Sequence, residues 1–175
     1  MIETHPLLPF VPPKTKYLLL GSFVTKEAFD NKKRANYTWY YANGGRNQFW
    51  PMLQDIYDVD LQTRKSMQNL MAKLHMAVAD IIYRCERKKY NNLDTNLINI
   101  VYNIKDISKI LRNTNIEKIY FSSRFVESKF RKLFKEYIVN HKEIELITLP
   151  SPSPRYASLS KEKKVNIYKK VLPKL

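Results

Sequence analysis

Four short apolar runs, spaced far enough apart for a helix to fit between them, most constrain the fold of this chain. The runs cover residues 17–23, 77–83, 118–122 and 144–149. Apolar residues are the majority in each run, which is typical of strands buried on both faces. Amphipathic segments predict helices over residues 49–57, 63–74, 104–112 and 125–137, with a final basic helix that Ser160 caps. Strands that alternate with helices predict an α/β fold: a single-domain three-layer α/β/α sandwich with a four-stranded, mostly parallel sheet.

The carboxyl ends of the predicted strands define one edge of this sheet. Ligands of open α/β sheets bind at that edge. We therefore expect the loops after Gly21, Tyr83, Ser122 and Leu149 to lie near one another. Residues 84–102 are predicted to be a polar loop that ends in an apolar stretch.

Length and charge bound the class of protein. The 175 residues fit one domain, 1–175, in which residues 1–15 form an extended, proline-rich lead-in. Lys and Arg number 31 against 16 Asp and Glu, and the net charge is +15. This excess indicates an anionic partner, with DNA or RNA ahead of an anionic membrane surface. The alternative is a lysine-rich surface that is only solvated.

The cysteine and histidine content argues against metal chemistry. Cys85 is the single cysteine, and the three histidines are scattered. We therefore expect no disulfide framework, no metal or iron–sulfur cluster and no cofactor. The chain has neither a membrane-spanning apolar run nor a secretory leader pattern, which predicts a cytoplasmic protein, and we expect a monomer.

Residues 40–50 combine flat rings, amides and two of the three glycines. Adjacent glycines let backbone approach a ligand closely, because no Cβ stands in the way. The Tyr41 ring can stack on a planar group, and Asn43 and Asn47 carry the paired donors and acceptors that read base edges. In a strongly basic chain this combination indicates a nucleobase ligand.

The loop over residues 149–158 is stiff and polar. Its three prolines fix φ and remove backbone donors. Two small hydroxyls, Ser151 and Ser153, can touch phosphate oxygens, and a cation and a flat ring follow at Arg155 and Tyr156. The plainer interpretation is a turn that joins a strand to a helix.

Four motifs, taken in order, resemble the uracil-DNA glycosylase superfamily. They read Gly-Ser-Phe-Val at 21–24, Tyr-Tyr at 40–41, Arg-Asn-Gln-Phe-Trp at 46–50 and Leu-Pro-Ser-Pro-Ser-Pro at 149–154. The likeness spans roughly residues 15–172. It looks closest to the branch of hypoxanthine-DNA glycosylases and, more distantly, mismatch-specific uracil glycosylases.

This resemblance implies a monofunctional DNA glycosylase that flips a base out of DNA and hydrolyses its N-glycosidic bond, as in base-excision DNA repair. It implies that the flipped base stacks on Tyr41 and that Asn47 is catalytic. Asp80 is the nearest carboxylate that could activate water, a capping or ion-pair role being the alternative. Further contacts are expected around the flipped nucleotide. Phe23 and Asn43 would lie beside the base, and Ser151 and Ser153 would contact phosphates. Arg155 or Tyr156 would be the wedge that fills the vacated base stack, and Arg46 would pair with a phosphate or a carboxylate.

Two departures from the family pattern leave the base open. Phe23 stands where many members place a water-handling Asp or Asn, and residues 43–45 replace a motif that contains proline. The excised base could be hypoxanthine, uracil or a bulky modified pyrimidine of phage DNA, in which case the role would be anti-phage defence. A DNA-binding module that has lost hydrolysis is the second hypothesis. An unrelated α/β enzyme is the third, although neither a phosphate-binding loop nor a dinucleotide fingerprint is present.

Overall fold

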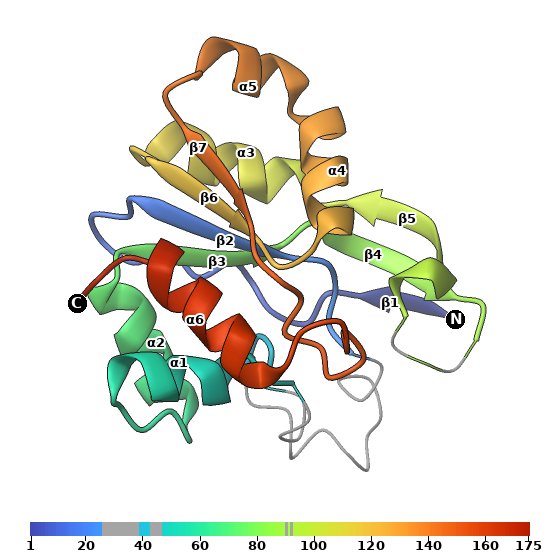
Figure 1. Cartoon of the computed structure of the whole chain (residues 1–175). Coiled ribbons are helices and arrows are strands. Elements are labelled where there is room, and N and C mark those ends of the chain that lie inside the picture. The colour runs from blue at the N-terminus through green and yellow to red at the C-terminus, as the bar shows by residue number, and fades with distance from the viewer. Residues whose placement is uncertain (26–38, 43–46, 90, 92) are drawn as a thin grey trace.

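The parallel sheet predicted from the sequence is present. The computed structural model describes residues 1–25, 39–42, 47–89, 91 and 93–175, so Asn43 and Arg46 lie outside the described residues. Strands β2 (Tyr17–Gly21), β3 (Met76–Asp80), β6 (Lys118–Phe121) and β7 (Glu145–Thr148) pair in the order β3-β2-β6-β7. All three pairings are parallel, which places the four carboxyl ends at one edge (Figure 1).

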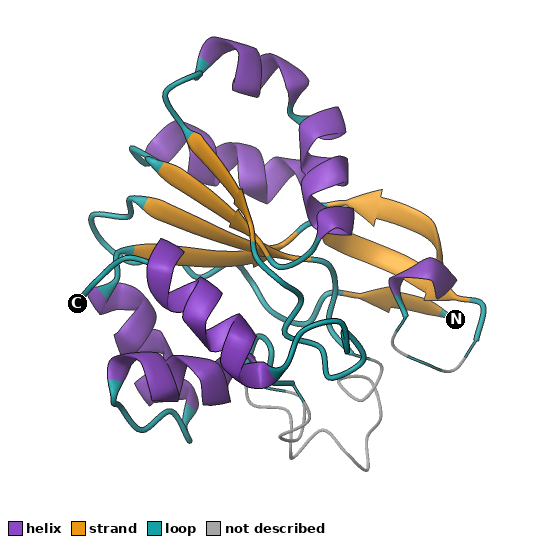
Figure 2. Ribbon diagram, in the orientation of Figure 1, coloured by secondary structure: helices purple, strands orange, loops and turns teal. Residues whose placement is uncertain are grey.

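Helices cover both faces of this sheet, as predicted (Figures 1 and 2). On one face lie α1 (Phe49–Tyr57), α2 (Arg64–Lys73) and α6 (Lys161–Val171); on the other lie α3 (Ile104–Asn113), α4 (Arg124–Leu133) and α5 (Lys135–Asn140). Leu19 and Val78 pack into the first layer, whereas Leu18, Leu20 and Ala77 pack into the second. The central strand β2 is buried and carries no charged residue, whereas the edge strand β7 is only partly buried and contains Glu145 and Thr148.

The helix ends follow local capping chemistry, with two differences from the prediction. Ser160 caps α6 by accepting a hydrogen bond from the Lys163 backbone N–H, as expected. The helix predicted over 125–137 is interrupted at Phe134, which separates α4 from α5. Asn103 precedes α3, but its side chain makes no capping hydrogen bond; its Nδ2 donates instead to the Asp80 carbonyl at 3.4 Å.

A second, antiparallel sheet of three strands was not predicted. It pairs β1 (Ile2–Thr4), β4 (Ile82–Arg87) and β5 (Leu97–Tyr102) in the order β1-β4-β5. The prediction of a polar loop over 84–102 is therefore wrong for most of that segment, which also holds a short 3₁₀ turn, η3 (Asp94–Asn96). The segment expected to be an extended lead-in contains β1 and, farther on, an antiparallel bridge between Phe10 and Val78.

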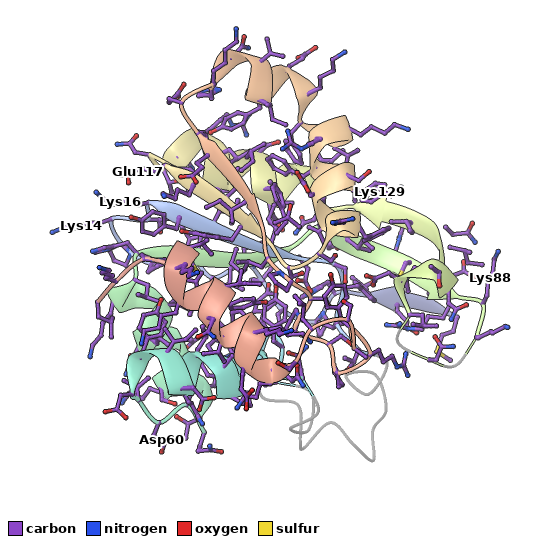
Figure 3. All side chains as sticks on the ribbon, viewed as in Figure 1. Lys14, Lys16, Asp60, Lys88, Glu117 and Lys129 are labelled. Atoms are coloured by element: carbon purple, nitrogen blue, oxygen red, sulfur yellow. The ribbon has the colours of Figure 1, made fainter. Side chains whose placement is uncertain are left out.

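Exposed charge is spread over the outside of the molecule. Figure 3 shows Lys14, Lys16 and Lys88 projecting away from the ribbon, and each is exposed. No helix in the described part of the chain is long and apolar enough to span a membrane.

Candidate functional site

A cavity of about 460 Å³ opens at the carboxyl ends of the parallel strands. Its wall includes residues 22–25 after β2, Asp80 of β3, residues 122–123 after β6 and residues 151–156 after β7. The structure thus brings together every site residue predicted from the sequence that it describes: Phe23, Tyr41, Asn47, Asp80, Ser151, Ser153, Arg155 and Tyr156. Their positions coincide with the expected edge, while their roles remain predictions.

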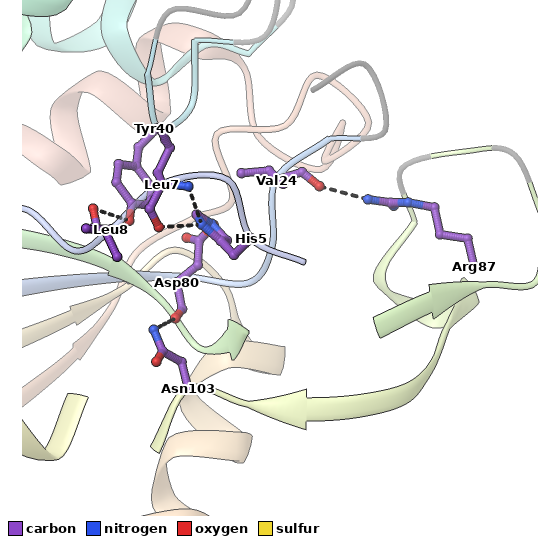
Figure 4. Close-up of polar contacts among 8 residues, drawn as sticks. All are labelled: His5, Leu7, Leu8, Val24, Tyr40, Asp80, Arg87 and Asn103. Carbon is purple, nitrogen blue, oxygen red and sulfur yellow. Dashed lines mark hydrogen bonds and ion pairs between the residues drawn. The ribbon is translucent and has the colours of Figure 1, made fainter. Parts of the chain in front are cut away.

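Asp80 lies at the cavity floor in a hydrogen-bonded pair that sequence reasoning missed. Its Oδ2 is 2.9 Å from Nε2 of His5, and the two side chains are only 6% and 5% exposed (Figure 4). Gly21 is paired with Asp80 across the β2–β3 ladder. A Cβ on Gly21 would lie 2.2 Å from Asp80 Oδ1, so glycine leaves the space that the carboxylate fills.

Local patterns gave no signal for His5. It follows a strand of three residues, too short to show alternation, and it contacts Asp80 across 75 positions of sequence. A buried carboxylate at a strand end does call for a donor, and that requirement is the one hint that the sequence contained.

Tyr41 presents its ring to the cavity on a firm backing. Its φ is 58°, a left-handed conformation that a residue with a bulky side chain adopts rarely. The ring packs on Phe49 with centroids 4.4 Å apart and planes inclined by 33°. Phe49 and Trp50, whose helical spacing in the sequence favours a core role over ligand contact, are both buried. The ring of Tyr41 is therefore held as a fixed platform.

The Tyr41 hydroxyl is buried and forms no hydrogen bond of ordinary geometry within the described part of the chain. Burial raises the pKa of Tyr41 well above its usual value; the nearby Asp80 carboxylate raises it further, and Ser122 opposes the shift. The hydroxyl consequently stays protonated at neutral pH.

Asn47 is fixed by the first turn of α1. Its Oδ1 accepts a hydrogen bond of 2.9 Å from the Phe49 backbone N–H, which satisfies one of the open donors at the helix start. With its carbonyl engaged, the side chain can offer its Nδ2 donors to the cavity that it lines.

The loop over residues 150–156 is braced from several sides. Gln48 donates its backbone N–H to the Pro152 carbonyl at 2.9 Å, and the Tyr168 hydroxyl donates to the Pro150 carbonyl at 2.7 Å. Ser151 Oγ accepts from the Ser153 N–H, and Ser153 Oγ accepts from the Arg155 N–H, each at 3.3 Å. Each serine thus keeps its own O–H proton for an acceptor outside the loop.

Lys164 supports the same loop from beneath. Its side chain comes from α6, is 1% exposed and donates to Gln48 Oε1 at 3.0 Å and to the Ser153 carbonyl at 3.2 Å. Burial lowers the pKa of Lys164, and the cation lies 5.5 Å from the Tyr156 ring centroid. No carboxylate pairs with it among the residues described, so positive charge is concentrated behind the loop.

Arg87 belongs to a basic stretch with Arg84, Lys88 and Lys89, but its side chain is engaged in the structure. Its Nε donates to the Glu3 carboxylate at 2.8 Å, its guanidinium donates to the Val24 carbonyl (Figure 4), and it lies over the Phe23 ring. Arg84, Lys88 and Lys89 are exposed. Arg87 therefore stabilises the cavity wall.

Asp94 is a second carboxylate on the cavity wall that the sequence analysis did not select. Burial and the nearby Asp80 carboxylate raise the pKa of Asp94, whereas a hydrogen bond from Ser22 and the Arg87 charge oppose the shift. No group of three or more metal-ligating side chains occurs within the described ranges. The chemistry that the cavity offers is thus that of carboxylates, hydroxyls, an amide and aromatic rings.

Comparison with known proteins establishes the fold. No family model matches the sequence, and no curated protein matches it. The structure is similar to the solution NMR structure of a candidate uracil DNA glycosylase from Methanosarcina acetivorans, with a TM-score of 0.70 over 98% of this chain and 97% of that one. The two sequences are 19% identical. The likeness confirms the predicted three-layer α/β architecture.

Proposed function

We propose that this protein is a monofunctional DNA glycosylase, which flips one nucleotide out of DNA and hydrolyses the bond between base and sugar. The observation that carries the proposal is the meeting of Tyr41, Asp80 and the loop 150–156 around one cavity. The net charge of +15 suits a polyanionic substrate. The name of the structurally similar Methanosarcina protein points in the same direction.

Base capture rests on stacking. Extracting a base costs a few kcal/mol of lost stacking, and a firm aromatic surface returns roughly 1–3 kcal/mol. Tyr41, packed on Phe49, provides that surface. The Nδ2 of Asn47 donates to the base or orients the attacking water, and Phe23 closes the wall beside it.

The braced loop grips the DNA backbone. The O–H groups of Ser151 and Ser153 donate to phosphates on either side of the flipped nucleotide, because their oxygens already accept from the loop itself. Arg155 and Tyr156 are exposed and stand ready to fill the vacated place in the base stack. A loop held at both ends resists the force needed to compress the backbone.

Hydrolysis then needs one water and one proton acceptor. The N-glycosidic bond breaks with its electron pair passing to the base, which leaves a cationic sugar at C1′. Water adds its oxygen to C1′ and gives a proton to the Asp80 carboxylate, which passes that proton on to the departing base. The negative charge of Asp80 also favours the cationic sugar in this buried site.

The proposed substrates are hypoxanthine, uracil or a bulky modified pyrimidine, and the corresponding roles are DNA repair or defence against phage. We place this activity in the cytoplasm, on a monomer that needs no metal or cofactor. The second candidate is a DNA-binding module without hydrolysis, which Phe23 favours because its side chain cannot hold a water.

Mass spectrometry of free bases tests the proposal. Purified protein is incubated with duplexes that carry deaminated bases and with modified phage DNA, and Asp80→Asn serves as the inactive control. We expect one free base to accumulate together with alkali-labile abasic sites. Tight DNA binding without release of any base would instead support the binding module.

A further inference from the structure

The N-terminal segment reaches Asp80, one of the residues that line the cavity, through His5. We propose that His5 is a positioning residue of the glycosylase site, which fixes the Asp80 carboxylate in one orientation. This inference rests on the proposed function, because it concerns the carboxylate assigned there to the water. Its basis is the buried contact of 2.9 Å between His5 Nε2 and Asp80 Oδ2 (Figure 4).

The main chain holds His5 on both sides. The His5 N–H donates to the Tyr83 carbonyl at 2.8 Å, which continues the β1–β4 ladder. Five residues later Phe10 exchanges two hydrogen bonds with Val78 in β3, each 2.9 Å long. The chain between these anchors runs alongside the end of β3, where Asp80 lies. Backbone hydrogen bonds on both sides therefore hold the His5 imidazole beside Asp80.

The ring of His5 is fixed as firmly as its backbone. It stacks on Tyr40 with centroids 5.5 Å apart and meets Phe23 edge-on at 5.6 Å. Its Nδ1 lies 2.9 Å from the Leu7 carbonyl oxygen and 3.2 Å from the Leu7 backbone N. A carboxylate opposite Nε2 favours a proton there, so Nε2–H donates to Asp80. With both ring nitrogens occupied, His5 has one orientation available.

Two groups besides His5 interact with Asp80. The Tyr41 hydroxyl and the second carboxylate, Asp94, both interact electrostatically with Asp80. Arg87 lies near Asp94 but is bonded to Glu3. Asp80 is 6% exposed, so protein groups and not bulk water supply most of its hydrogen bonds. The hydrogen bond from His5 engages Oδ2 and leaves Oδ1 directed toward Gly21 and the cavity that Asp80 lines.

Two substitutions at His5 separate positioning from packing. His5→Gln places an amide N–H close to the position of Nε2, whereas His5→Leu fills similar volume without a donor. The single-turnover rate of base release is measured at saturating duplex DNA, together with the dissociation constant for that DNA and the melting temperature. The duplex carries the base that the wild-type protein releases. His141→Leu makes the same change at a histidine outside the cavity lining and is the matched control.

We expect His5→Leu to lower the single-turnover rate about 10- to 100-fold while the DNA dissociation constant changes less than twofold, because a displaced catalytic group loses rate and not affinity. His5→Gln should recover most of the lost rate, and His141→Leu should match the wild type. If His5→Leu does not fold, His5→Ala with added imidazole replaces it, and the rate should rise with imidazole concentration.

Three outcomes would overturn the inference. They are an unchanged rate in His5→Leu, equal losses in the Leu and Gln variants, and His5→Ala that imidazole does not restore. Each of these leaves the proposed function intact, since the wild-type protein still releases base. A wild-type protein that releases no base from any duplex overturns the proposed function, and this inference with it.

Discussion

At the residue scale, the site depends on small fits that composition alone does not reveal. Asp80 was predicted as the nearest carboxylate, yet the sequence did not show that Gly21 sits opposite it in the β2–β3 register. Nor did it show that a Cβ at that position would collide with the carboxylate. Motif spacing identified residues that lie near one another; the contacts that orient them are made across strands.

Asn47 offers a test that separates helix capping from substrate contact. Asn47→Asp keeps an oxygen for the Phe49 N–H and adds charge that favours a helix start, but it removes the Nδ2 donors. We expect the melting temperature to be retained and the rate of base release to fall about 10²- to 10³-fold, the usual cost of losing one well-placed donor. The measurement is single-turnover release alongside thermal unfolding, and normal turnover in Asn47→Asp would remove Asn47 from the site.

Asp94 predicts a change of stability with pH. Burial raises the pKa of Asp94 above the ordinary 3.8, so the native state binds more protons than the unfolded state as pH rises from about that value. The stabilisation from this group is therefore present below pH 3.8 and is lost as pH rises through the native pKa. Asp94→Asn should gain stability relative to wild type as pH increases from 3 to 7 in urea unfolding. A constant difference across that range would contradict the assignment.

At the scale of elements, the strands buried on both faces could be predicted and the half-exposed ones could not. The four parallel strands lie in segments where apolar residues are the majority, because helices cover both faces of the sheet. In β4 the register shifts between Ile82 and Arg84 and again between Arg84 and Glu86. These irregularities break the two-residue alternation by which an exposed strand is recognised. Strand β1 is only three residues long and shows no pattern at all.

The loop 150–156 and helix α6 act as one unit through Lys164, which leads to a paired test. Lys164→Met removes the donors to Gln48 and Ser153 and the positive charge behind the loop, whereas Lys163→Met removes an exposed charge one residue away. We expect Lys164→Met to slow base release at least tenfold, because the loop loses its fixed position. Lys163→Met should release base at close to the wild-type rate. Equal rates in the two variants would show that α6 does not position the loop.

At the scale of the whole molecule, the cavity joins segments from nearly the full length of the chain. Tyr41 enters from the segment before α1, His5 contacts the lining residue Asp80 from the end of β1, and Lys164 braces the loop from the last helix. Topology predicted that strand ends would meet, since the carboxyl ends of parallel strands share an edge. It could not predict the contribution of the N-terminal segment, because strand β1 pairs with β4 some eighty positions later, a contact that no local pattern reports.

The net charge of +15 predicts that salt weakens DNA binding without destabilising the fold. Salt weakens binding because releasing counterions from DNA into a more concentrated salt solution gains less free energy, with a slope of about −0.9 per phosphate contact in log Kobs against log salt. Salt should leave unchanged or raise the melting temperature of the free protein, since it screens self-repulsion. Both effects are measured between about 50 and 500 mM salt, a range over which surface charges become screened. DNA binding is followed by fluorescence anisotropy with a duplex oligonucleotide, and folding is followed by thermal unfolding.

Arg155→Gln should make the binding slope shallower by about one unit. Arg112→Gln, at the last turn of α3 and outside the cavity lining, should leave it unchanged. Binding that is insensitive to salt would mean that the basic surface does not follow the phosphates.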